Sequence, residues 1–209
     1  ANDGIGDYSE PYGVPLGDDM MFVVFDSAVV GTKALKSTDP QYRRYAAQFD
    51  KAFALGSKRP NAFFMNHQPI LGFNSDGGPK AQPGNAALQS VLESIVPSVL
   101  FPPNVQAVLS GHVHMMQIVS FSTPQPPIFI PGNGGTSLVD DFTSFPSDQS
   151  PVQGAVVANL LHTASFGFMT MERGVSGWII RSWDRAGHPV TTCNLFARKA
   201  SCTPLVAAR

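Results

Sequence analysis

Short apolar runs separated by turn-forming residues dominate the larger part of the chain. Such runs predict strands that are buried on both faces, because these strands need apolar side chains at successive rather than alternate positions. They cover residues 20–25, 62–65, 105–109, 115–121 and 127–130. Apolar residues also recur at three- and four-residue intervals in two places. This spacing predicts a helix from Pro40 to a stop at Gly56, and a second from a cap at Asn85 through Ile95.

The end of the chain differs, because apolar and polar residues alternate there. Alternation of this kind predicts an antiparallel meander with a hairpin turn at 184–187. Its strands cover residues 166–171, 178–183 and 190–193. Residues 1–19 are rich in Gly and Pro, which argues against any long element there. Residues 136–162 predict a long loop that carries one apolar patch at 155–161.

Two histidines follow one of the buried strands. The strand at 105–109 stops at Ser110-Gly111, and His112 and His114 come next with Val113 between them. Alternation along an extended backbone would put both imidazoles on the same side. Neutral imidazole binds zinc, iron, copper or nickel, so the pair predicts half of a metal site. Two histidines of a sheet that form only local hydrogen bonds would give the same pattern.

A third histidine, His67, occupies the same kind of position after another strand. It follows the apolar strand at 62–65 and precedes Pro69, which cannot continue a strand ladder. Polar residues that follow strand ends are where layered proteins build their sites. We therefore predict that His67, His112 and His114 converge as metal ligands.

Three motifs resemble the later motifs of the calcineurin-like metallophosphoesterases, including the purple acid phosphatase branch. They are His67-Gln68-Pro69, Gly111-His112-Val113-His114 and Gly132-Asn133-Gly134-Gly135. The resemblance implies an α/β (α+β) fold, a layered sandwich of two mixed β-sheets flanked by helices. It also implies a dinuclear centre of divalent or trivalent metal ions (Fe, Mn or Zn). In that centre His67 and His112 would bind one metal, and His114 the other.

The motifs of the family's first half do not occur in this sequence. The family supplies an Asp-x-His pair, a bridging aspartate in a Gly-Asp motif and an asparagine motif, but no Asp-x-His occurs here. Gly17-Asp18-Asp19 falls too late in the order and predicts a turn. Asn2-Asp3 could be a remnant of the asparagine motif, although a frayed polar terminus explains it more simply. We therefore interpret residues 1–209 as the C-terminal part of a single metallophosphoesterase-like domain whose N-terminal part is missing.

By this resemblance the parent domain is a metal-dependent phosphoesterase that hydrolyses a phosphomonoester or phosphodiester through metal-bound hydroxide. Bridging carboxylates reduce the repulsion between two metal ions, and the chain has none in a matching motif. Asp26, Asp140 and Asp141 are candidates by composition only. We expect a companion chain or segment to carry the missing aspartates. Two alternatives remain open: a non-catalytic binding or scaffold domain without the dinuclear centre, and a mononuclear histidine site for another reaction.

Composition narrows the remaining classes of function. With 209 residues, 43% of them hydrophobic, the chain is large enough for a substantial core. Only 14% of the residues are charged, the net charge is -1, and no basic stripe suggests nucleic acid. No apolar run approaches the roughly 20 residues of a membrane span. Cys193 and Cys202 fit either two free thiols or a disulfide, and the disulfide would indicate a secreted or periplasmic protein.

Overall fold

Two β-sheets form the framework of the computed structural model, which describes residues 9–97, 100–135 and 137–204. The strand order in the first sheet is β1 (Tyr12–Leu16), β2 (Met20–Phe25), β3 (Asn61–Asn66), β6 (Val105–Ser110), β8 (Ile128–Pro131), β7 (Met116–Phe121) and β9 (Val157–Thr163). In the second sheet the order is β10 (Gly167–Gly174), β11 (Gly177–Asp184), β12 (Pro189–Phe196) and β13 (Lys199–Pro204). A hairpin of two short strands, β4 (Asn74–Ser75) and β5 (Ala81–Gln82), lies outside both sheets.

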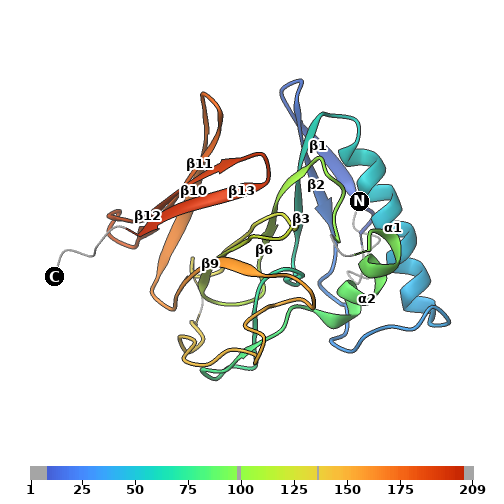
Figure 1. The fold of residues 1–209 in the computed structure, drawn as a ribbon, viewed down its shortest axis with the longest axis horizontal. Helices are drawn as coiled ribbons and strands as arrows, with labels where there is room; N and C mark the ends of the chain where they lie inside the picture. The colour runs from blue at the N-terminus through green and yellow to red at the C-terminus, as the bar shows by residue number, and fades with distance from the viewer. Residues whose placement is uncertain (1–8, 98–99, 136, 205–209) are drawn as a thin grey trace.

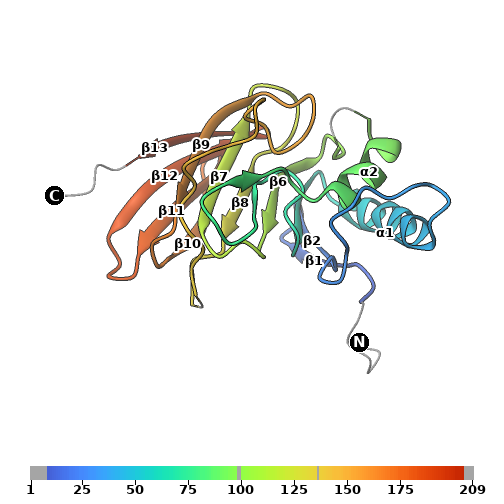
Figure 2. The same cartoon turned by 90° about the horizontal axis from the view of Figure 1, so that it is seen from below.

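The described part of the chain forms three layers, with the first sheet in the middle (Figures 1 and 2). The second sheet lies on one side of it, and the helices α1 (Pro40–Gly56) and α2 (Ala86–Ile95) lie on the other. Successive residues of a central strand therefore face different cores: Phe63 packs toward the second sheet, whereas Phe64 packs toward the helices. This two-sided burial explains the continuous apolar runs.

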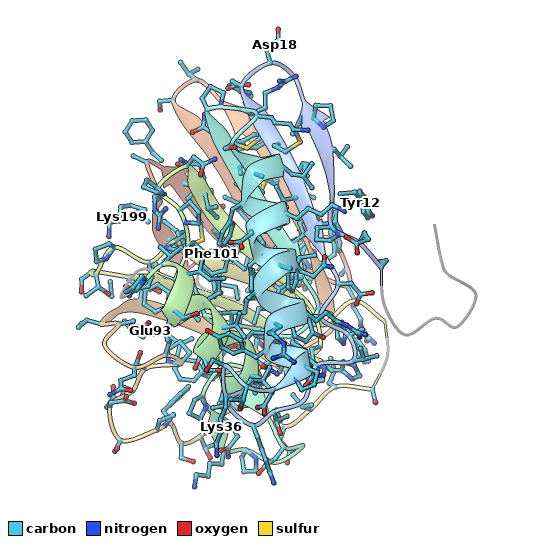
Figure 3. All side chains as sticks on the ribbon, turned by 90° about the vertical axis from the view of Figure 1, so that its right-hand side faces the viewer. Tyr12, Asp18, Lys36, Glu93, Phe101 and Lys199 are labelled. Carbon is cyan, nitrogen blue, oxygen red and sulfur yellow. A yellow bond between two sulfur atoms is a disulfide. The ribbon has the colours of Figure 1, made fainter. Side chains whose placement is uncertain are left out.

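The helix α1 runs along the strands of the first sheet, as Figure 3 shows from the helix side. Pro40 occupies its first turn, where the missing backbone N–H removes no helical hydrogen bond. Phe49 stacks on Phe25 of β2 with ring centroids 4.3 Å apart, so this helix is held by aromatic packing. At the start of α2, the side chain of Asn85 accepts a hydrogen bond of 3.0 Å from the backbone N–H of Leu88. The predicted cap is therefore confirmed.

The predicted α+β fold with two sheets is confirmed, and its sheets differ in character. In the first sheet β2, β3, β6 and β8 pair in parallel, whereas β1, β7 and β9 pair antiparallel to their neighbours, so this sheet is mixed. The second sheet contains the predicted meander and one further strand, β13, and its described pairings are all antiparallel. The expectation that both sheets are mixed is therefore wrong for this sheet. Cys193 and Cys202 face each other across β12 and β13 and form the disulfide. No helix in the described ranges is long and apolar enough to cross a membrane.

Two segments for which no strand was predicted contain one. Residues 12–16 form β1, which pairs antiparallel with β2, and residues 157–163 form β9, which pairs antiparallel with β7. The prediction of one long loop over 136–162 is therefore wrong at its end, where the apolar patch begins a strand. Asn2-Asp3, the possible motif remnant, lies outside the described residues.

The turn between β12 and β13 fastens the second sheet to the first. The guanidinium of Arg198 donates to the carbonyls of Pro102 and Pro124, the latter at 2.9 Å. The ammonium of Lys199 donates to the carbonyls of Phe121 and Thr123, both at 3.0 Å. Charged donors satisfy these carbonyls, and such hydrogen bonds are stronger than those between neutral groups.

We expect Arg198→Ala to lower the free energy of unfolding by about 2 kcal/mol, because it removes hydrogen bonds from a charged, half-buried donor. Urea denaturation measures the effect. Arg185→Ala, in the exposed turn between β11 and β12, is the matched control and should change stability by less than about 0.5 kcal/mol. Equal losses in the two variants would mean that this turn does not fasten the sheets.

Candidate metal site

His67 and His112 leave the first sheet at the same edge. The strands β3 and β6 are parallel neighbours, and Asn66 pairs with Ser110 at their carboxyl ends. Residues that follow the carboxyl ends of adjacent parallel strands lie side by side. The two histidines are therefore neighbours in space although 45 positions separate them in the sequence.

The imidazole rings of these two histidines are in direct contact. Nδ1 of His112 lies 3.2 Å from Nε2 of His67, and the ring centroids are 5.0 Å apart. In a pair of neutral rings, one of these nitrogens donates and the other accepts. Two nitrogen ligands of one tetrahedral zinc ion lie about 3.3 Å apart, given Zn–N bonds of about 2.0–2.1 Å. The spacing of the two nitrogens therefore fits two ligands of a single ion.

His112 adopts a backbone conformation that is rare for residues with a side chain. Its φ of 69° lies in the left-handed region. On either side of it, the N–H of Val113 donates to the carbonyl of Gly111, and the N–H of Met115 donates to that of Val113, each at 2.8 Å. Residues 111–115 thus form tight turns. The prediction that an extended backbone aligns His112 with His114 is wrong, since no extended segment exists there.

His114 lies in the same tight turns, and its carbonyl accepts a hydrogen bond of 3.2 Å from the N–H of Val139. However, no group of three His, Cys, Asp or Glu side chains within the described ranges could hold a metal ion. The structure brings His67 and His112 together and does not bring His114 into the same group.

The surroundings of His112 favour its neutral form. Burial lowers the pKa of His112 below its usual value, and electrostatic interactions with His67 and His114 lower this pKa further. Neutral imidazole is the form that binds metals. A metal ion arriving at neutral pH therefore competes with few protons at His112.

The carboxylates considered as additional ligands have other partners. Asp26, which follows β2, accepts hydrogen bonds from the N–H of Ser9 at 2.8 Å and from that of Ala28 at 3.0 Å. Asp141 contacts Nδ1 of His162 at 2.6 Å. Within the described ranges, Asp140 does not join the histidine pair in a group that could hold a metal ion.

The Gly132-Asn133-Gly134-Gly135 segment packs against the histidine-bearing turns. A Cβ on Gly132 would lie only 1.8 Å from the carbonyl oxygen of Val113, so only glycine fits there. The side chain of Asn133 donates to the carbonyl of Ser165 at 2.7 Å. Close packing of the backbone accounts for the first glycine of this motif without any bound anion.

A cavity of about 620 Å³ lies between the two sheets beside His67. Its walls are mainly apolar side chains of β2, β3, β6, β10 and β11, and its polar lining includes Ser27, Asn66 and Ser110. None of these three residues is among the predicted site residues. The only signal was their position after or at the end of predicted strands, which many structural residues share.

Two solved structures share this arrangement of elements. Purple acid phosphatase PPD1 from yellow lupin (Lupinus luteus) seeds matches with a TM-score of 0.51 at 13% identity. The fold is metallophosphoesterase-like. GAP50, described as the anchor in the inner membrane complex of Plasmodium, matches with a TM-score of 0.51 at 14% identity. The matches cover 93% and 90% of this chain, but only 32% of the phosphatase chain and 54% of the GAP50 chain.

At identities this low, the structural similarity is evidence for a metallophosphoesterase-like fold and not for a shared activity. No protein-family model matches the sequence, and a search of curated proteins finds no similar one. The chain spans well under two thirds of the length of both solved structures.

The left-handed backbone at His112 predicts an unusual order of stabilities. Glycine adopts this φ without the clash of a Cβ, so His112→Gly should be more stable than His112→Ala by about 1 kcal/mol. Thermal unfolding of the two variants measures the difference. At His114, which is not among the described residues with positive φ, glycine should be the less stable choice. The same order at both positions would contradict the assigned backbone.

The close packing at Gly132 predicts a position-specific loss of stability. Gly132→Ala places a methyl group against the Val113 carbonyl and should lower the free energy of unfolding by at least about 3 kcal/mol. Gly135→Ala in the same motif is the matched control, because no atom lies within 4 Å of its added Cβ. Denaturant unfolding compares the two variants, and equal small effects would exclude this role for Gly132.

Proposed function

We propose that residues 1–209 form the C-terminal part of a metal-dependent phosphoesterase domain. The observation that carries this proposal is the 3.2 Å separation of ring nitrogens between His67 and His112, at the carboxyl edge of a metallophosphoesterase-like sheet. This edge is where α/β sheets commonly bind ligands. The proposed substrate is a phosphomonoester or a phosphodiester, and the proposed reaction is hydrolysis.

The proposed ligand set follows from the donors at this edge. His67 and His112 would hold one ion, and His114, on the adjacent turn, would contribute to a second. When bound, such ions supply Lewis-acid activation of water and compensate charge on a phosphoryl oxygen. The histidines themselves bind as neutral rings, and the lowered pKa of His112 keeps this residue in that form.

The carboxylates of a dinuclear centre would come from another segment or a companion chain. Supporting this, the described residues bring no third His, Cys, Asp or Glu side chain to the histidine pair. We also propose that the protein is secreted or periplasmic, and the Cys193–Cys202 disulfide is compatible with such an oxidising compartment.

We expect the 209-residue chain to bind Zn²⁺ or Co²⁺ weakly, at about one equivalent, because only part of the proposed ligand set is present. Isothermal titration should show that His67→Ala and His112→Ala each weaken binding at least tenfold, whereas His114→Ala has a smaller effect on this first ion. His188→Ala is the matched control, since His188 is exposed and contacts Asp184 away from the site. Equal binding by all variants would contradict the proposed ligands.

The isolated chain should hydrolyse p-nitrophenyl phosphate only slowly when Mn²⁺, Fe²⁺ or Zn²⁺ is added, because the proposed site is incomplete. Steady-state assays test this, and turnover at ordinary enzyme rates, a kcat of about 1–10³ per second, would contradict it. Mass spectrometry of the protein purified from its source would show whether a second polypeptide accompanies it.

Metal analysis of that complete assembly separates catalysis from a scaffold role. The similarity to GAP50, which is described as an anchor, makes this comparison necessary. Two metal equivalents with phosphatase activity would support the phosphoesterase. An assembly without metal that still holds its partners would support the scaffold.

A further inference from the structure

We propose that Ser27 is a positioning residue for the histidine pair, an inference that rests on the proposed function. Ser27 follows the end of β2, next to β3, and its side chain is fully buried. Its Oγ accepts hydrogen bonds from the backbone N–H groups of His67 at 3.0 Å and Gln68 at 2.9 Å. One hydroxyl thus binds the backbone of a proposed ligand directly.

These hydrogen bonds begin where the strand ladder stops. Phe25 and Asn66 are the last paired residues of β2 and β3. The backbone N–H groups of His67 and Gln68 follow Asn66 and have no partner in the ladder between β2 and β3. Gln68 is also buried. A hydroxyl oxygen has two lone pairs and can satisfy both groups. An alanine at position 27 would leave both groups without this acceptor, and a buried unsatisfied donor is destabilising.

The β6 side holds His67 through a second set of contacts. The hydroxyl of Ser110 donates to Oδ1 of Asn66 at 2.7 Å, and the N–H of Gly111 donates to the carbonyl of His67 at 3.1 Å. The side-chain amide of Asn66 in turn donates to the carbonyl of Gln68. His67 is therefore held between the ends of β2 and β6.

This polar network connects three strand ends and fixes where the two rings meet. His112 is one residue beyond Gly111, which lies beside the ring of His67: a Cβ at Gly111 would be in ordinary contact with Nδ1, at 3.5 Å. Ser27 holds the other side of the same backbone segment. Freeing this segment would let Nε2 of His67 move away from Nδ1 of His112. A metal would then have to bring its two ligands together during binding.

The test compares Co²⁺ and Zn²⁺ binding by the 209-residue chain and its Ser27 variants. Ser27→Ala should weaken binding about tenfold, as is typical when a group that orients a metal ligand is removed. The visible absorption of bound Co²⁺, which reports ligand geometry, should also change in Ser27→Ala. Ser27→Thr keeps the hydroxyl and should restore the spectrum and most of the affinity.

Ser150→Ala is the matched control. Ser150 is also a buried serine whose hydroxyl bonds to backbone, donating to the carbonyl of Val152 at 2.7 Å, but it lies outside the site. This variant should leave the affinity and the Co²⁺ spectrum unchanged whatever it does to the unfolding temperature. If Ser27→Ala loses no more affinity than Ser150→Ala and keeps the wild-type spectrum, the positioning role is refuted.

Failure of this inference is distinct from failure of the proposed function. A wild-type chain that binds neither Co²⁺ nor Zn²⁺ through His67 and His112 would overturn the proposed metal site, and the inference with it. A wild-type chain that binds, together with an unaffected Ser27→Ala variant, would overturn only the role of Ser27. Should Ser27→Ala fail to fold, the Ser27→Thr spectrum decides: a spectrum unlike that of the wild type refutes the role.

Discussion

The parallel pairing of β3 with β6 is the constraint on which the rest of the structure depends. Both strands are covered on two sides, so Phe63 and Ala107 face the second sheet while Phe64 and Val108 face the helices. Apolar packing on both faces leaves little room for polar side chains in the middle of these strands, where Gln106 of β6 is the exception. The candidate site residues therefore lie beyond the carboxyl ends of β3 and β6, where the shared register brings the residues that follow the two strands together.

The sequence predicted the central strands because two-sided burial produces continuous apolar runs, whereas half-covered strands lack such a signal. In β9, Asn159 and His162 interrupt the apolar residues, and the strand is only partly buried. In β1, Gly13 and Pro15 suggested a turn, yet an edge strand tolerates both. Gly13 is suited to this edge, since a Cβ there would lie 2.8 Å from the sulfur of Met21.

For the candidate site, strand-end position was a better guide than side-chain spacing. It correctly indicated that His67 and His112 lie together, because parallel strands end at one edge. The spacing argument for His112 and His114 failed because the chain turns sharply where a φ of 69° replaces an extended conformation. The contacts of Ser27 were not predictable, because its partners lie 40 and 41 residues away and a serine after a strand has no distinctive pattern.

Electrostatics explains why a histidine pair of this kind needs other groups to become a dinuclear centre. Two unit charges 4 Å apart repel by about 4 kcal/mol at an effective dielectric constant of 20, so two divalent ions at that distance repel by roughly 16 kcal/mol. Neutral imidazoles contribute no negative charge against this repulsion. Each carboxylate placed between the ions attracts both. In the proposed centre, the imidazoles of His67 and His112 would therefore serve a first ion only, and a second ion would require anionic oxygen beside it.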